Sequence, residues 1–286
     1  MNSTFAPGPK DRCIEVDGFR FVTDDANTLG IGEGAGFEPH VLGALMRWTR
    51  AGDTVVDIGA NIGYFTAHLA RKVGPDGQVH AFEPEAENFR RLSVNMRANG
   101  LNQVWMHHAA LGAESRDAEL HVSVGNIGMH RLYESVCCDG PAQQVRVRTL
   151  DDVLGAQRVD LIKVDIEGYE WMALSGAQQC LRANRRIVVV SEYCAPSMLE
   201  AGISPLAYLE LMAEQGLMAH DLDGQVTDAA ELRADARAYD AFGAQRFIDA
   251  CKGCGPGEID AIVVQVAGAL GCQRPFIENL VFMRPD

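Results

Sequence analysis

The sequence lacks a long apolar run, a secretion signal and an excess of basic residues. No stretch reaches the roughly 18 apolar residues of a membrane-spanning helix, and the first residues lack the basic start and apolar stretch of a signal peptide. The 286 residues include 25 Lys and Arg against 39 Asp and Glu, a net charge of −14. Because an acidic surface repels phosphate backbones and anionic lipids, nucleic acid and membranes are not expected as partners. We therefore expect a cytoplasmic protein.

Cysteine is present but follows no clear pattern. Eight cysteines are scattered along the chain, and without a secretion signal we expect them to be reduced. Cys251 and Cys254 have the spacing of a zinc or redox pair, with Cys272 as a further candidate ligand. A convincing zinc site shows two such pairs, or a Cys pair with a spaced His pair. Incidental cysteines are therefore the better interpretation.

Short apolar segments alternate with amphipathic ones along most of the chain. With 47% hydrophobic and 22% charged residues, the composition is that of an ordinary globular protein, which excludes disorder for the bulk of the chain. Continuous apolar strands separated by helices are typical of a parallel sheet covered on both faces. Strands are expected at 54–57, 78–82, 104–108, 161–165, 187–190, 217–221 and 279–283, and helices from 39, at 64–73, 85–98 and 169–181, and from 205 to about 215.

Three segments depart from this alternation. Residues 1–36 contain a hairpin signal, because Asp17-Gly18 separates two apolar segments, and a glycine-rich connection follows. Within the main domain, 37–286, two segments at 119–124 and 145–148 are expected as added strands. Residues 223–275 are rich in Ala, Asp, Gly and Gln. We interpret them as a helical or irregular insertion that forms a lid or a contact between copies of the chain.

The strongest local signal is VVDIGANIGYFT, residues 55–66. A buried strand ends at Asp57, and Gly59 and Gly63 let the chain turn tightly into a helix. Twenty residues after Gly63, Glu83 ends the second strand. Open α/β sheets bind ligands at this edge, and a carboxylate there can accept hydrogen bonds from the two hydroxyls of a ribose.

A nicotinamide dinucleotide is one candidate ligand for this loop, which would make the protein an oxidoreductase. The glycine spacing argues against it, because the G-x-G-x-x-G pattern is absent and Asp57 would repel a pyrophosphate. An acidic loop suits a ligand with a cationic amino-acid end and no phosphate. S-adenosylmethionine has these features.

Five segments together resemble the FkbM family of S-adenosylmethionine-dependent methyltransferases. They are VVDIGANIGYFT, HAFEPEAENFRRL, NGLNQVWMHHAALG, TLDDVL and LIKVDIEGYEWMALSGA, in order between residues 38 and 195. The resemblance implies a Rossmann-like class I methyltransferase fold, an α/β fold with a mostly parallel seven-stranded sheet. It also implies that the cofactor is bound by Asp57, Gly59, Asn61 and Gly63 at its methionine end, Glu83 at the ribose, Glu38 near the amino group, Ala110 near the adenine, and Asp165.

Methyl transfer to an alcohol benefits from a base, because a protonated hydroxyl is a poor nucleophile. Asp165, in the D-x-E-G signature that the resemblance points to, ends a strand at the cleft and is the first candidate. Glu167 either contacts the acceptor or caps the helix that begins near Tyr169. His130 has a suitable intrinsic pKa but is equally compatible with a surface role. By resemblance, Asn126 would contact the acceptor and Glu192 would be a further acid.

A metal-assisted mechanism is an alternative, because Asp165, Glu167 and Glu192 are oxygen donors of the kind that Mg²⁺ prefers. The sequence permits such a cluster but does not demand it, and no metal is predicted. We expect an O-methyltransferase that acts on a hydroxyl of a sugar or secondary metabolite. An oxidoreductase and a non-catalytic S-adenosylmethionine-binding protein remain alternatives.

Overall fold

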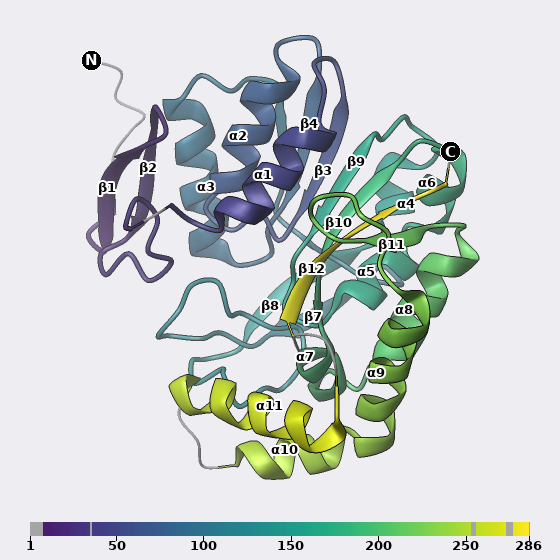
Figure 1. Cartoon of the computed structure of the whole chain (residues 1–286). Coiled ribbons are helices and arrows are strands. Elements are labelled where there is room, and N and C mark those ends of the chain that lie inside the picture. Colours follow the sequence, from purple (N-terminus) through teal and green to yellow (C-terminus); the bar gives the residue numbers. More distant parts are fainter. Residues whose placement is uncertain (1–7, 35, 253–255, 273–276, 286) are drawn as a thin grey trace.

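One central sheet organises the molecule (Figure 1). The computed structural model describes residues 8–34, 36–252, 256–272 and 277–285. Within these ranges, seven strands form the sheet in the order β11-β12-β10-β9-β3-β4-β5. Their bounds are β3 Thr54–Ile58, β4 Gln78–Phe82, β5 Val104–His107, β9 Leu161–Val164, β10 Val188–Cys194, β11 Met218–His220 and β12 Ile277–Met283.

Strand direction defines the edge of the sheet at which ligands would bind. The strands β5, β4, β3, β9 and β10 pair in parallel, whereas β12 runs antiparallel between β10 and β11. This confirms the predicted mostly parallel seven-stranded sheet, and with it the Rossmann-like class I methyltransferase fold. Because β12 runs towards the C-terminus marked in Figure 1, the carboxyl ends of the parallel strands lie at the opposite edge.

Helices cover both faces of the sheet, as predicted. Neighbouring residues of one strand enter different cores: Val55 packs with the helices of one face and Val56 with those of the other, and both are fully buried. This double burial explains why the strands are apolar without alternation. The first face carries α1 Pro39–Trp48, α2 Tyr64–Val73 and α3 Ala86–Ala98, and the second α4 Leu150–Leu154, α5 Glu170–Ser175, α6 Gln178–Ala183 and α8 Pro205–Glu214.

The helix predicted over 169–181 is instead two short helices, α5 and α6, that break at Gly176. The Gly176 carbonyl accepts a hydrogen bond from the Asp151 amide at 3.0 Å and is therefore not available to one continuous helix. The Asp151 carboxylate in turn accepts from the amides of Gln179 and Cys180, which caps α6. The break thus depends on α4, which lies far away in the sequence.

A second sheet of three strands contains the added segments that the sequence predicted. Its strands are β6 Ala110–Leu111, β7 Arg116–Leu120 and β8 Gln143–Arg148. The prediction placed the first added strand at 119–124, but β7 ends at Leu120 and only His121 continues the pairing, as a bridge to Arg131. The helix α7, Ala195–Glu200, was not predicted.

The N-terminal hairpin is present and packs against helix α3. The strands β1 Asp11–Val16 and β2 Phe19–Asp24 join at Asp17 and Gly18, whose φ angles of 53° and 76° match the predicted tight turn. The Asn95 side chain of α3 bonds to both the amide and the carbonyl of Val22. Two arginines of α3, Arg90 and Arg91, pair with Asp11.

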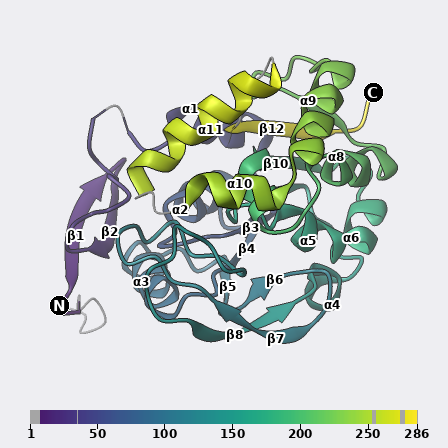
Figure 2. The same cartoon turned by 90° about the horizontal axis from the view of Figure 1, so that it is seen from below.

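Residues 223–275 contain three helices within their described part: α9 Ala229–Phe242, α10 Ala244–Cys251 and α11 Pro256–Leu270. Helix α9 packs against α7 and α8, and α10 packs against α7 and α11. Figures 1 and 2 show α10 and α11 across the end of the molecule at which the parallel strands finish. Cys254 lies outside the described residues. No helix that the structure describes is long and apolar enough to cross a membrane.

Candidate active site

The loop after β3 turns sharply because the next strand end lies directly behind it. Gly59 has a φ of 77°, and a Cβ there would collide with the carbonyl of Asp165. Gly63 precedes α2, and a Cβ there would meet Leu92 and Met96 of α3. Gly59 is therefore required by the packing of the backbone, whereas Gly63 is favoured by its φ of 90°, because Leu92 and Met96 reach it only with the ends of flexible side chains. Gly63 lines neither of the cavities described below.

Glu83 fixes this loop from the neighbouring strand. Its carboxylate accepts the amide hydrogens of Asn61 and Glu85, each at 2.8 Å, and only 5% of the residue is exposed. Burial raises the pKa of Glu83 to about 8, against the opposing effect of the two amides. Each carboxylate oxygen can accept one more hydrogen bond, so the side chain can still bind a pair of ligand hydroxyls.

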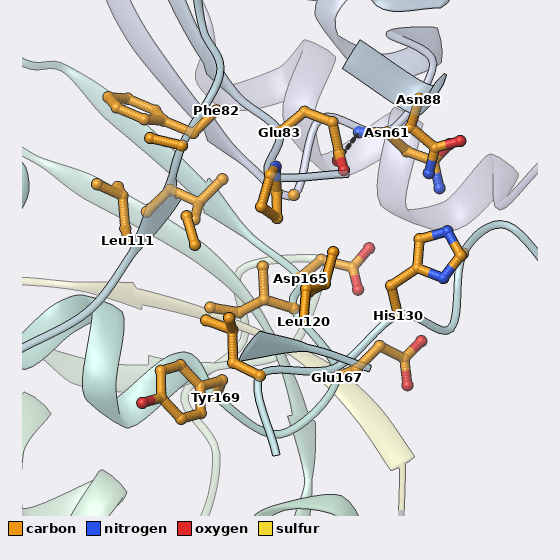
Figure 3. A pocket seen from close by; sticks show the side chains of 18 of the residues that line it. Asn61, Phe82, Glu83, Asn88, Leu111, Leu120, His130, Asp165, Glu167 and Tyr169 are labelled. Atoms are coloured by element: carbon orange, nitrogen blue, oxygen red, sulfur yellow. Dashed lines mark hydrogen bonds between the residues drawn. The ribbon is translucent and has the colours of Figure 1, made fainter. Parts of the chain in front are cut away.

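An apolar cavity opens beside Glu83 (Figure 3). It contains about 580 Å³ of empty space, part of which is open solvent. Phe82 and Leu111 lie on one side, while Glu83, Asn61 and Asn88 lie towards the other. The cavity also receives the predicted site residues Gly59, Ala110, His130, Asp165 and Glu167.

A second, acidic cavity adjoins the first. The two cavities share Gly59, Asn61, Gly128, Asp165 and Glu167. The acidic cavity adds three further predicted residues, Glu38, Asn126 and Glu192, and the unpredicted Lys163. The structure thus brings together ten of the predicted residues around one continuous site, and Asp57 and Gly63 lie outside it.

Asp57 is buried beneath the loop and does not face the cavities. It is fully buried, and its Oδ2 accepts a hydrogen bond from Thr66 at 2.6 Å. Its Oδ1 lies 3.5 Å from the Nζ of Lys163. Burial raises the pKa of Asp57, and the Lys163 charge opposes that effect. The structure therefore does not place Asp57 where it could contact a ligand directly, as the sequence predicted. The Asp57 carboxylate instead anchors the loop from within the protein.

Asp165 follows β9 and faces the cavities. Its side chain is 29% exposed, and its Oδ2 lies 3.3 Å from the Nζ of Lys163. The helix-capping role considered for Glu167 is not observed, because α5 begins after Tyr169 without a side-chain cap. Glu170, the first residue of α5, instead binds the turn before the helix: its Oε1 accepts from the amides of Ile166 and Gly168 at 3.0 and 3.2 Å.

Glu167 pairs with a buried arginine. Arg131, of which 5% is exposed, donates to Glu167 at 2.8 Å and to Glu200 of α7 at 2.9 Å. The hydroxyl of Tyr133 donates to the carbonyl of Glu167 at 2.6 Å. Burial raises the pKa of Glu167, and the Arg131 charge opposes it. The connection between β7 and β8 thereby holds the turn after β9.

The segment 126–130 lies over the loop after β3. The carbonyl of Ile127 accepts from the side-chain amides of Asn61 and Asn88, at 2.9 and 2.8 Å. His130 reaches the apolar cavity, and its Nδ1 accepts from the amide of Ser123 at 3.1 Å. Burial lowers the pKa of His130, so the ring is a weaker base than a free imidazole. His130 lines the apolar cavity, whereas Lys163 lines the acidic one.

Two further acids complete the acidic cavity. Glu38 has a φ of 41° just before α1; the residue is exposed as a whole, and desolvation at the cavity and the Asp165 charge raise its pKa. Glu192 is part of β10, and its Oε2 is buried without a hydrogen-bond partner among the described residues. Burial and the nearby carboxylates of Asp165 and Glu167 raise the pKa of Glu192.

The described residues hold no metal-binding cluster of three or more His, Cys, Asp or Glu side chains. Asp165 is paired with Lys163 and Glu167 with Arg131, so two of the donors considered for Mg²⁺ already have cationic partners. The donor set of this site therefore does not fit the magnesium cluster that the sequence permitted.

The residues around the apolar cavity have the chemistry that the nucleoside part of S-adenosylmethionine would need. Apolar walls suit a planar ring, and the Glu83 carboxylate can accept hydrogen bonds from two neighbouring hydroxyls. Asn88 also lines this cavity and is 1% exposed, and its Oδ1 has no hydrogen-bond partner among the described residues. A buried acceptor of this kind is costly unless a ligand donates to it. Asn88 was not predicted, since a helical Asn carries no distinct sequence signal.

A protein-family model described as the methyltransferase FkbM domain matches residues 57–216, more than half of the chain. The chain is 34% identical over 143 residues to "Methyltransferase 1" of Beauveria bassiana, covering 43% of this chain and 57% of that protein. It therefore spans less than two thirds of that relative. It is 27% identical to "2-O-methyltransferase NoeI" of Sinorhizobium fredii, covering 58% of this chain and 73% of that protein.

A further relative is "Hexuronic acid methyltransferase AglP" of Haloferax volcanii, 26% identical over 63% of this chain and 70% of that protein. Among solved structures, M. jannaschii TYW2 in complex with AdoMet matches with a TM-score of 0.47 at 15% identity, over 98% of this chain and 89% of that chain. The fold assignment itself rests on the strand order described above.

Proposed function

This chain belongs to the FkbM methyltransferase family, and on that premise we propose that it transfers a methyl group from S-adenosylmethionine to a hydroxyl of a sugar or another secondary metabolite. The observation that carries the proposal is the junction of the two cavities at Gly59, Asn61 and Asp165. A ligand with an apolar ring at one end and a cationic end at the other matches this arrangement of an apolar and an acidic cavity.

The apolar cavity would bind the nucleoside and the acidic cavity the methionine end. Glu83 would accept hydrogen bonds from both ribose hydroxyls, and Asn88 would accept one further donor. Ala110 lines the cavity near the expected adenine position. Glu38 would bind the cationic amino group. The pKa of Glu38 is raised in the ligand-free protein, and a bound cation would favour its ionised form.

Asp165 is the residue we propose as the base. When bound, S-adenosylmethionine supplies a methyl group that is activated by positive sulfur. Asp165 would orient the acceptor hydroxyl and take its proton, because it lines both cavities and lies at their junction. Asn126 and Glu167 would contact the acceptor, and Glu192 would accept a hydrogen bond from it through the unsatisfied Oε2.

The name of one relative supports a sugar acid as the acceptor, and the name of another supports methylation of an oxygen. One is called a hexuronic acid methyltransferase and the other a 2-O-methyltransferase. The acidic cavity is also compatible with a polyhydroxylated acceptor, because carboxylates accept hydrogen bonds from hydroxyl groups. We propose a small-molecule acceptor, with no role for nucleic acid, in the cytoplasm.

Residues 37–286 would form the methyltransferase domain and residues 1–36 an N-terminal extension of it. We propose the 223–275 segment as a lid, with a contact between copies as the alternative. The position of α10 and α11 beyond the carboxyl ends of the strands supports the lid. Phe247 and Cys251 of α10 also pack with Val136, in the connection that holds Glu167.

Ligand-dependent thermal unfolding tests the proposed cofactor. S-adenosylhomocysteine at 100 times its dissociation constant should add about 2.7 kcal/mol to the free energy of unfolding, while NAD should add nothing. Methylation of a panel of sugars and hydroxylated metabolites, followed with S-adenosylmethionine labelled in the methyl group, tests the acceptor class. Stabilisation by NAD alone would refute the proposed function.

A further inference from the structure

Lys163 lines the acidic cavity, although no sequence pattern pointed to this residue. It is the third residue of β9 and lies opposite Asp57 of β3 in the parallel register. Its side chain is 3% exposed. Its Nζ lies 3.1 Å from the carbonyl oxygen of Gly59, 3.5 Å from Asp57 and 3.3 Å from Asp165. One ammonium group therefore contacts the loop after β3 and the turn after β9.

The surroundings keep this buried group positively charged. Burial alone would lower the pKa of a lysine, but the carboxylates of Asp165 and Asp57 outweigh it and raise the pKa of Lys163. The Nζ also lies 5.2 Å from the centre of the Phe65 ring, a further favourable contact for a cation. A buried ammonium needs such partners, because an unpaired one costs several kcal/mol.

The two carboxylates beside Lys163 differ in what they face. Asp57 is fully buried and bonded to Thr66, so its pairing with Lys163 can be purely structural. Asp165 is 29% exposed and lines both cavities, and no other hydrogen bond or ion pair of its carboxylate is found among the described residues. The orientation of the Asp165 carboxylate therefore depends on Lys163.

We propose that Lys163 is a positioning residue for methyl transfer: it holds the Asp165 carboxylate aimed into the site, and through Gly59 and Asp57 it fixes that carboxylate relative to the cofactor loop. Lys163 does not itself contact the acceptor. The inference rests on the proposed function for its catalytic consequence, but the pairing with Asp165 can be measured without any turnover.

The direct test is a titration of the Asp165 carboxyl carbon by ¹³C NMR in aspartate-labelled protein. The signal is assigned by its absence in Asp165→Asn. Lys163→Met should raise the pH of half-titration, because the opposite charge 3.3 Å from the Asp165 carboxylate is lost while the carboxylates of Glu38, Glu167 and Glu192 still face it. Lys72→Met, which removes an exposed lysine near the end of α2, should leave it unchanged.

Lys163→Met leaves Asp57 buried without its cation and can fail to fold for that reason. The double variant Asp57→Asn with Lys163→Met removes both buried charges and should still show an upward shift for Asp165, though a smaller one, because the repulsion from Asp57 is lost as well. In turnover, the acid limb of the kcat profile should move to higher pH by the amount seen in the NMR titration. If Lys163 were purely structural, its loss would lower stability but would change neither the pH of half-titration of Asp165 nor the pH of the acid limb of kcat.

The proposal is overturned if Asp165 titrates at the wild-type pH in a folded variant that lacks Lys163. This outcome is distinct from a failure of the proposed function. In that second case, the wild-type protein neither binds S-adenosylhomocysteine nor methylates an acceptor, while the NMR titration still reports whether Lys163 controls Asp165.

Discussion

Glu83→Ala is the sharpest test of the cofactor site. Hydrogen bonds to a charged group contribute about 1.5–3 kcal/mol each. Loss of the two proposed ribose bonds should therefore weaken S-adenosylhomocysteine binding by at least about 3 kcal/mol, or roughly 100-fold in the dissociation constant. The affinity should be measured by isothermal titration calorimetry at pH 9, where the wild-type carboxylate is ionised because its pKa is about 8.

The stability of this variant must be measured separately from its affinity. The substitution removes a buried carboxylate, but it also leaves the amides of Asn61 and Glu85 without their acceptor, each at a cost of about 1–3 kcal/mol. Denaturant unfolding of the ligand-free protein gives this change directly. Affinity is then compared only if the variant is folded at the assay temperature.

Glu87→Ala is the matched control for this experiment. Glu87 lies in the first turn of α3, its side chain is 61% exposed, and it pairs with Arg90 on the surface. Its removal should change neither the affinity nor, by more than about 0.5 kcal/mol, the stability. If folded Glu83→Ala binds S-adenosylhomocysteine within threefold of the wild type, the ribose lies elsewhere and the proposed orientation of the cofactor is wrong.

Three further predictions concern protonation, chemistry and motion. The raised pKa of Glu83 means that the ligand-free protein holds a proton on this carboxyl group at pH 7. Binding of S-adenosylhomocysteine should therefore release a proton and weaken as the pH falls from 8 to 6. Calorimetry in buffers of different ionisation enthalpy measures the proton release, and its absence would contradict the prediction. Asp165→Asn should lower kcat by roughly 10²–10⁴-fold with cofactor affinity nearly unchanged, whereas a larger loss in His130→Ala would make the histidine the base. Hydrogen exchange in residues 244–270 should slow when S-adenosylhomocysteine binds, and equal exchange in both states of a monomer would refute the lid.

The local patterns of the sequence predicted most of the fold because each depends on a few neighbouring residues. Apolar runs such as 54–57 and 78–82 became parallel strands, since burial on both faces requires continuous apolar residues. Ser204 and Pro205 begin α8 as predicted, with the Ser204 hydroxyl accepting from the amide of Ala207. The order of the strands was accessible only through the resemblance, because pairing partners lie far apart in sequence.

Tertiary contacts decided what the local patterns could not. The helix predicted over 169–181 breaks because Asp151, on another helix, takes the carbonyl of Gly176 and caps α6. A residue at the end of a strand can be predicted to contact a ligand and still point into the protein. Asp57 does so because its carboxylate binds Thr66 and Lys163.

The sequence by itself determined most of the strands and helices of the main sheet layer, the glycine turn and the set of acids that end the strands, because these follow from local sterics and periodicity. Only the tertiary structure decided which charges meet. Lys163 joins two loops that are about 100 residues apart in sequence, and Arg131 joins Glu167 to α7. Burial then sets the protonation of these groups, since the desolvation of a carboxylate depends on every segment packed around it and not on its neighbours in the chain.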